Sequence, residues 1–247
     1  MCRVSKDAIS SMLFAIKHIN YLRAEPDPIK DSGACLLDKK QLPDLQWLKP
    51  MQKRRLSAFN KMTLHCAYEA GKHDDEIPVV FSSRHGDLHK TSALLNTLAQ
   101  NECLSPTAFS MSVHNASAGL LSIFTENRAA SNTISAGRDS FVMVLIDAYA
   151  RINSGVCDKV LVVHCDQAMP NDYLCFQDEQ QIDHALAFVM SKDEGVMVSM
   201  NSLPQLKKEE KESHLPQSLA FLDFLLSDLS KTTIPGIYND WQFEVER

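Results

Sequence analysis

The sequence lacks the marks of a secreted, metal-binding or membrane-spanning chain. Its seven cysteines are odd in number and include no C-x-x-C pair, which argues against a disulfide framework and a structural zinc site. The one apolar stretch near the start, residues 9–22, is interrupted by Lys17 and His18 and is too short to span a bilayer. No cleavage signature follows it, and Met12 is an alternative to Met1 as the functional start. We therefore expect a cytoplasmic protein without metal, other cofactor or membrane partner.

Positive charge is also scarce. Lys and Arg number 25 against 31 Asp and Glu, and the net charge is −6, so we expect no surface for nucleic acid. The basic cluster Lys53-Arg54-Arg55 is more typical of a solvated helix face than of a docking patch. Apolar residues, in contrast, make up 45% of the 247 positions, which is enough for a sizeable core.

Apolar spacing along the chain predicts strands that alternate with helices. Short apolar runs bounded by charges are typical of buried strands, and longer runs with helical spacing are typical of helices. The expected strands are residues 13–19, 77–81, 131–135, 160–163, 185–190, 196–200 and, as an edge strand, 241–245; the expected helices are residues 51–71, 87–100, 115–128, 139–153 and 219–229; irregular connections are expected at 24–49 and 206–214. This order predicts one α/β domain over residues 1–247, with a mixed sheet, a core at about 45–202 and a C-terminal helix and tail at 203–247.

A tight turn at Ala136-Gly137 joins the expected strand at 131–135 to the apolar helix at 139–153. Such a turn aims its residue at solvent above the amino end of the helix, where the helix dipole and backbone N–H groups stabilise a developing anion. A cysteine at this place would have a favoured thiolate. The residue here is Gly137, so the sequence predicts a nucleophile site without a nucleophile.

Three segments, in this order, resemble the β-ketoacyl synthases of fatty acid and polyketide assembly, which have a thiolase fold. They are residues 104–119, Ser135-Ala136-Gly137 in the place of the family's Thr-Ala-Cys, and residues 157–163. More narrowly, three motifs are similar to a truncated branch, the ketosynthase-like chain length factors of aryl polyene pigment clusters. These motifs are Ser83-Arg84-His85-Gly86, Ser112-Val113-His114-Asn115 and the segment from Ser135 to Ser140. The resemblance covers about residues 45–200. It implies half of a thiolase-like fold, similar to a ketosynthase N-terminal half, with a mixed β-sheet flanked by helices.

The resemblance also implies that this chain does not condense acyl groups. Gly137 stands where the family has its nucleophilic cysteine, and the two histidines that promote decarboxylation of the extender lie in a second half for which this chain is too short. Since a nucleophilic route needs a thiol with an activating group, we expect no catalytic residue and no enzyme activity from this chain alone. The family implies instead a heterodimer, or a higher-order assembly, with a catalytic ketosynthase; the acyl carrier protein is then reached through the complex.

In such dimers the partner closes the far end of the acyl tunnel, and the strand before the nucleophile pairs across the interface. By this resemblance, residues 131–134 pair with the ketosynthase, and residues 109–113 lie near the tunnel floor, where large side chains limit product length. Arg138 and Asp139 either pair across the interface or reach the partner's site; alternatively, Asp139 favours the amino end of the helix. The candidate tunnel and interface residues are Phe109, Met111, Ser112, Val113, Asn115, Ser131, Asn132, Thr133, Ile134, Ser135, Arg138 and Asp139.

Two other interpretations stay open. Arg84 and His85 after one buried strand, with His164 at the end of a later one, resemble histidine phosphatases, which use a phosphohistidine intermediate cradled by arginines. The simpler interpretation of His85 is a strand-end histidine bonded to backbone. The last alternative is a structural scaffold subunit that has lost any role in the tunnel.

Overall fold

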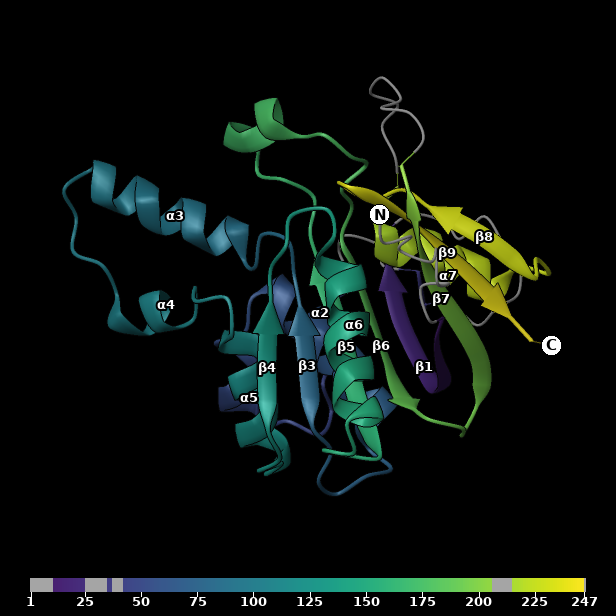
Figure 1. Ribbon diagram of the computed structural model, residues 1–247. Helices are drawn as coiled ribbons and strands as arrows, with labels where there is room; N and C mark the ends of the chain where they lie inside the picture. Colours follow the sequence, from purple (N-terminus) through teal and green to yellow (C-terminus); the bar gives the residue numbers. More distant parts are fainter. Residues whose placement is uncertain (1–10, 25–34, 37–41, 206–214, 247) are drawn as a thin grey trace, which may run out of the picture.

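The computed structural model describes residues 11–24, 35–36, 42–205 and 215–246, and it arranges them in three layers (Figure 1). A mixed β-sheet forms the middle layer, and helices cover both of its faces. Each face has its own apolar core. The α/β class with a mixed sheet, which the sequence predicts, is confirmed.

The sheet has a parallel part and an antiparallel part. Its nine described strands are β1 (Met12–Arg23), β2 (Cys35–Leu36), β3 (Val79–Ser82), β4 (Ser131–Ile134), β5 (Lys159–Asp166), β6 (His184–Ser191), β7 (Val196–Pro204), β8 (Lys231–Ile234) and β9 (Asn239–Val245). Their order is β4-β3-β5-β6-β1-β7-β9-β8, with β2 beside β1. The strands β4, β3 and β5 are parallel, and each neighbouring pair from β5 to β8 is antiparallel. Among the described strands, β4 therefore forms one edge of the sheet and β8 the other.

Two helices cover each face of the sheet. The helices are α1 (Pro50–Lys53), α2 (Ala58–Gly71), α3 (Leu88–Ala99), α4 (Pro106–Ser110), α5 (Ala116–Thr125), α6 (Ser140–Asn153), the 3-10 helix η1 (Asn171–Phe176) and α7 (Gln217–Leu226). The core under α2 and α5 includes Phe59, Phe81 and Leu121. On the opposite face, Phe141 of α6 lies 5.2 Å from Phe221 of α7, measured between ring centroids. Because both faces are covered, every residue of β3, the neighbour of the edge strand β4, is buried.

The helices α3 and α4 stand apart from the three layers (Figure 1). Of the residues of α3, only Ser92 is buried. Leu95 and Leu98 of α3 and Phe109 of α4 are 49%, 51% and 58% exposed. Large apolar side chains presented side by side in this way are typical of a surface that a partner covers.

The expected helix at 51–71 is two helices, α1 and α2. Ser57 has an extended backbone, and its hydroxyl accepts a hydrogen bond from the Asn60 amide at 3.1 Å. The hydroxyl thus caps the start of a new helix. Apolar spacing alone did not show this break.

The expected edge strand at 241–245 belongs to β9, which lies between β7 and β8. The prediction of an edge was wrong, because alternation of apolar and polar residues reports one solvated face, and an interior antiparallel strand has one too. The actual edge strand, β8, has only four residues, too few for a pattern. The predicted connection at 206–214 and most of the one at 24–49 lie outside the described residues.

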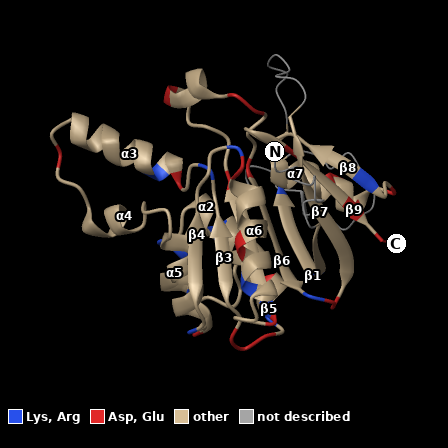
Figure 2. Cartoon of the chain, in the orientation of Figure 1, with Lys and Arg blue, Asp and Glu red and all other residues tan. Residues whose placement is uncertain are grey.

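No helix in the described ranges is long and apolar enough to cross a membrane. Within the same ranges, no three His, Cys, Asp or Glu side chains are grouped to hold a metal ion. Lys53 of the basic cluster pairs with Asp44 at 2.5 Å, and Figure 2 shows Lys and Arg scattered among Asp and Glu. Of the described cysteines, Cys103, Cys157, Cys165 and Cys175 are free thiols.

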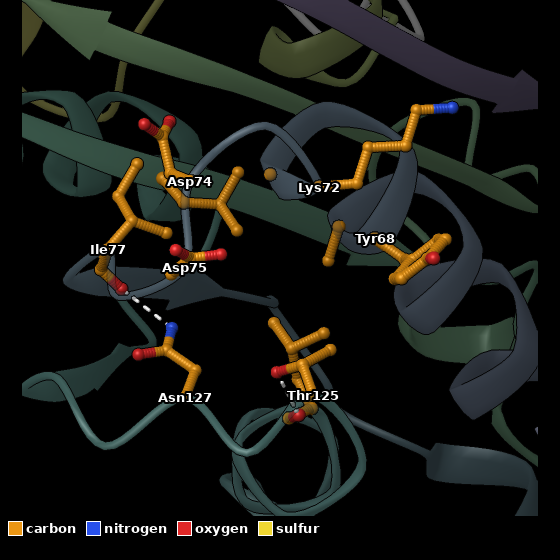
Figure 3. A pocket seen from close by; sticks show the side chains of 11 residues that line it. Tyr68, Lys72, Asp74, Asp75, Ile77, Thr125 and Asn127 are labelled. Atoms are coloured by element: carbon orange, nitrogen blue, oxygen red, sulfur yellow. Dashed lines mark hydrogen bonds between the residues drawn. The ribbon is translucent and has the colours of Figure 1, made fainter. Parts of the chain in front are cut away.

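A cavity of about 190 Å³ lies between the carboxyl ends of α2 and α5 (Figure 3). Its floor is apolar and includes Ala67, Leu121 and Leu161, and its rim includes Tyr68 and Asn127. Asn127 is engaged within the chain, because its Nδ2 donates to the Ile77 carbonyl at 2.8 Å. Ile77 lies just before β3, so the cavity is at the amino ends of the parallel strands.

Candidate functional site

A sharp turn at residues 135–139, here called the elbow, joins the end of β4 to the start of α6. At its centre, Gly137 is exposed and has a φ of +58°, a left-handed conformation that favours glycine. The Ser140 hydroxyl fixes the turn, because it donates to the Gly137 carbonyl at 2.7 Å and accepts from the Ala136 amide at 2.9 Å. Because the elbow follows the last residue of β4, it lies at the carboxyl end of the parallel strands, opposite the cavity.

The elbow carries no activated nucleophile. Gly137 has no side chain, and the two neighbouring serines are engaged: Ser140 is buried, and the Ser135 hydroxyl donates to the Arg84 carbonyl at 3.0 Å. A hydroxyl needs an adjacent base before it attacks. In the part of the chain that the structure describes, no histidine is hydrogen-bonded to either serine.

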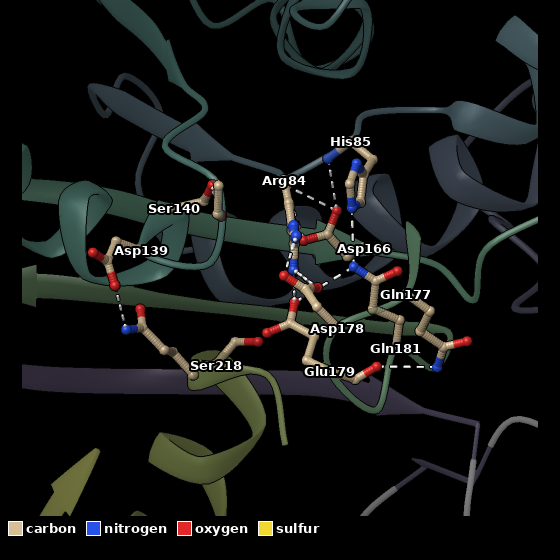
Figure 4. Close-up of polar contacts among 12 residues, drawn as sticks. Arg84, His85, Asp139, Ser140, Asp166, Gln177, Asp178, Glu179, Gln181 and Ser218 are labelled. Atoms are coloured by element: carbon tan, nitrogen blue, oxygen red, sulfur yellow. Dashed lines mark hydrogen bonds and ion pairs between the residues drawn. The ribbon is translucent and has the colours of Figure 1, made fainter. Parts of the chain in front are cut away.

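Beside the elbow, buried side chains at the ends of β3 and β5 form a polar network. Ser82 Oγ lies 2.8 Å from His164 Nδ1, and His164 Nε2 lies 3.2 Å from Asp166 Oδ2. Asp166 also accepts from the Ser83 hydroxyl at 2.7 Å and from the Arg84 amide at 3.0 Å (Figure 4). Burial alone raises the pKa of Asp166, but the hydrogen bond and charge of His164 outweigh it and hold the pKa well below its ordinary value. The ionised carboxylate thus fixes the loop that follows β3.

Arg84 joins this network to the loop that carries η1. Its guanidinium pairs with Asp178 and Glu179, both at 2.8 Å (Figure 4). Burial raises the pKa of Glu179, although the bond from Arg84 opposes the shift. Burial also lowers the pKa of His85, whose Nε2 lies 2.9 Å from the Gln181 amide nitrogen. These contacts hold the whole loop against the ends of β3 and β5.

This geometry does not match a phosphohistidine site. His164 is 3% exposed and both of its ring nitrogens are engaged within the chain. The charge of Arg84 is balanced by two carboxylates. The order serine, histidine, aspartate also resembles a hydrolase triad, but Ser82 is 0% exposed and no substrate reaches it. The network therefore has a structural role, and we set the phosphatase interpretation aside.

The predicted interface residues 131–135 and 138–139 lie together at the edge strand and the elbow. β4 pairs with β3 on one side, and no other described strand pairs with it. Asp139 is buried, and its carboxylate accepts from Gln217 Nε2 at 2.8 Å. The side chain of Asp139 is therefore committed within the chain.

The predicted tunnel residues 109–113 lie on α4 and in the turn after it. His114 ties this turn to the strand end, since its Nε2 lies 2.9 Å from the Ser83 carbonyl. Asn115 is at the N-cap position of α5, but its side chain makes no capping bond. The structure thus places this second group on the outer side of β4, in the part that stands apart in Figure 1.

The network around Asp166 was not predicted from the sequence. A local signal was present, because His164 and Asp166 end one buried strand while Ser82 and Ser83 end its neighbour. Carboxyl ends of parallel strands meet at one edge, so the convergence of these side chains could have been predicted. The ion pairs of Arg84 with the η1 loop gave no such signal, because they join segments far apart in sequence.

The fold agrees with the comparisons to known proteins. The family model of the β-ketoacyl synthase N-terminal domain matches residues 30–244. The chain belongs to the β-ketoacyl synthase family. This membership confirms the predicted family and its thiolase-like fold. No curated protein sequence matches the chain.

Two solved structures are similar to this β-ketoacyl synthase-family chain. One is the ketosynthase ApeO in complex with its chain length factor ApeC from Xenorhabdus doucetiae, with 28% identity and a TM-score of 0.78 over 94% of this chain and 99% of that chain. The other is the ishigamide ketosynthase/chain length factor, with 14% identity and a TM-score of 0.55 over 66% of this chain and 53% of that chain. The second likeness shows the fold alone.

Proposed function

We propose that this chain is a chain length factor that does not condense acyl groups itself and that pairs with a catalytic ketosynthase. The elbow carries the proposal. It keeps the strand-to-helix geometry at which the family presents its nucleophile, but the residue at that position, Gly137, has no side chain. The similarity to a ketosynthase in complex with its chain length factor supports the same role.

The open edge of β4 is the proposed pairing surface. The Ala130 and Ile134 carbonyls accept from the amides of Val79 and Ser83, on the β3 side. Because backbone groups alternate in direction along a strand, the amide and carbonyl of Thr133 face away from β3. A strand of the ketosynthase is the occupant that we propose for this edge.

The exposed side chain of Phe109 is the proposed limit on product length. It is 58% exposed on a helix that stands apart from the sheet, and a partner that covers it gains apolar burial. In the complex, Phe109 and residues 111–113 would line the far end of the acyl tunnel and stop the chain by excluded volume. We propose polyene or polyketide chains of the aryl polyene type as the product, and the cytosol as the location, in keeping with the free thiols.

The test is reconstitution with the ketosynthase of the same gene cluster. We expect the two chains to co-purify, and we expect elongation of acyl groups on the carrier protein only when both are present. A ketosynthase that elongates equally well without this chain would contradict the proposal. If pairing mutants lose the complex but tunnel mutants leave every product unchanged, the chain is a structural scaffold instead.

A further inference from the structure

The amino end of α6 is held by the C-terminal segment of the same chain. Asp139 precedes the first residue of α6 and is 7% exposed. Its Oδ1 accepts from Gln217 Nε2 at 2.8 Å (Figure 4). Its two oxygens accept from the Ile237 amide at 3.2 and 3.1 Å. The Gln217 amide and the Ile237 backbone N–H, which both donate to this buried carboxylate, therefore come from the C-terminal segment.

Three elements meet at this carboxylate. Gln217 is the first residue of α7, and the same Nε2 also donates to the Pro235 carbonyl at 2.9 Å. Pro235 and Ile237 belong to the turn between β8 and β9. The four residues Asp139, Gln217, Pro235 and Ile237, here called the latch, thus join α6, α7 and the β8–β9 turn.

The turn is closely fitted to the elbow. A Cβ atom on Gly236 would lie 2.3 Å from the Asn239 carbonyl oxygen and 2.9 Å from Asp139 Oδ1, so only glycine fits there. Ile237 Cδ1 lies 3.5 Å from the place where a Cβ on Gly137 would be. The turn therefore lies beside the centre of the elbow and is joined to it through the latch.

The elbow passes this restraint to β4 over a short path. Only residues 135–139 separate the last residue of β4 from α6. The hydroxyl of Ser135 within that path is itself fixed by the Arg84 carbonyl at 3.0 Å. Because this connection is short and partly fixed, a displacement of the start of α6 also displaces the end of β4.

We propose that the latch is a positioning device through which the C-terminal segment sets the elbow and the open edge of β4. Asp139 is its positioning residue and acts inside the chain. The first half of this inference concerns the chain alone. The second half, that the latch controls pairing, rests on the proposed function.

Hydrogen exchange on the isolated chain tests the first half. The variants are Asp139→Ala, which removes both acceptors, and Asp139→Asn, which keeps one. Asp147→Ala is the matched control, because Asp147 lies on the same helix and pairs only locally with Arg151 at 2.7 Å. We expect Asp139→Ala to raise exchange about tenfold at residues 231–238 and at 131–139, Asp139→Asn to raise it less, and the control to change neither. Faster exchange at 231–238 alone would overturn the coupling; where the alanine variant does not fold, the asparagine variant decides.

Affinity for the catalytic ketosynthase tests the second half. We expect Asp139→Ala to bind about tenfold more weakly than the natural chain, Asp139→Asn to recover part of the loss, and Asp147→Ala to bind normally. Equal binding by the natural chain and by a folded Asp139→Ala chain overturns the control of pairing. If the natural chain itself does not bind, the proposed function fails. The hydrogen-exchange measurement on the isolated chain still tests whether the latch positions the elbow and β4.

Discussion

At the residue scale, Gly137 shows how a backbone conformation restricts what a site can become. Its φ of +58° costs a residue with a Cβ about 1 kcal/mol or more. Its neighbours offer no base, because the Ser140 hydroxyl is bonded to the turn and His164 is buried in the network beside it. A thiol placed here would have neither a relaxed backbone nor an activating group.

We therefore expect Gly137→Cys to leave the isolated chain without condensation activity. Its free energy of unfolding should fall by about 1 kcal/mol, because the left-handed backbone at this position is strained for cysteine, which has a Cβ. Urea denaturation and an elongation assay with carrier-bound substrates measure the two effects. Turnover by this variant in the absence of a ketosynthase would contradict the expectation.

Phe109 offers a second test at this scale. Phe109→Ala should lengthen the products of the reconstituted pair by about one or two extension units, because a ring that fills the end of the tunnel is removed. Mass spectrometry of the released chains measures the change. Leu229→Ala is the control, since Leu229 has the same exposed fraction, 58%, near the other edge of the sheet. An unchanged product profile for Phe109→Ala would contradict the placement of Phe109 at the end of the acyl tunnel.

At the scale of the element, the edge of β4 is partly occupied by its own side chain. Asn132 Oδ1 accepts from the Thr133 amide at 2.9 Å. That amide faces away from β3, so Asn132 takes the place of the missing neighbour strand. An edge whose donor is satisfied in this way is protected from random pairing while it stays available to a partner.

Thr133→Pro should remove this donor without breaking the pairing of β4 with β3. We expect the affinity for the ketosynthase to fall about tenfold, because one backbone hydrogen bond across the interface is lost and the edge is distorted. Thr133→Val keeps the amide and the β-branched shape, and it should bind almost normally. Size-exclusion chromatography and calorimetry compare the two. Equal affinity for both variants would show that β4 is not the pairing strand.

The elements divide into those that local sequence determines and those that it does not. β3, β5 and α6 were predicted because their apolar runs are continuous and they are buried on the faces that those runs require. β8 was missed because four residues carry no pattern, and the place of β9 was wrong because its neighbour was missed. The elbow was predicted for the same reason as α6, since a strand, a turn and a helix follow one another in the chain.

The hydrogen-bond partners of the site residues, in contrast, could not be predicted from local sequence. Asp139 was assigned either to the helix end or to the interface, and its actual partners, Gln217 and Ile237, come from the C-terminal segment. No spacing in the sequence links residues so far apart. Long-range polar contacts of this kind depend on the assembled sheet, so the structure was needed to find them.

At the scale of the whole molecule, a buried imidazole links folding to pH. His184 is 1% exposed, and its Nε2 lies 2.8 Å from the Ser218 hydroxyl. Burial, and then the charge of His164, lower the pKa of His184 to about 4, while the nearby Asp166 opposes the shift. Below its ordinary pKa of 6.5, the unfolded chain takes up a proton that the folded chain excludes.

The free energy of unfolding should therefore fall as the pH drops from about 6.5, with a loss on the order of 3 kcal/mol as it approaches 4. Asp166 adds a further loss below about pH 4, because its pKa is held low in the folded chain and rises to its ordinary value on unfolding. Urea denaturation at a series of pH values measures this slope. His184→Gln, which does not titrate, should flatten it; a natural chain with the same stability at neutral and mildly acidic pH would contradict the assignment.

The position of β1 has a consequence for synthesis. This first strand lies inside the sheet, between β6 and β7, and those neighbours are residues 184–204. During translation β1 therefore remains unpaired with β6 and β7 until most of the described chain has left the ribosome. Such late closure of distant contacts slows folding and leaves apolar strands uncovered meanwhile, so the yield of folded chain should depend on chaperones and on temperature during growth.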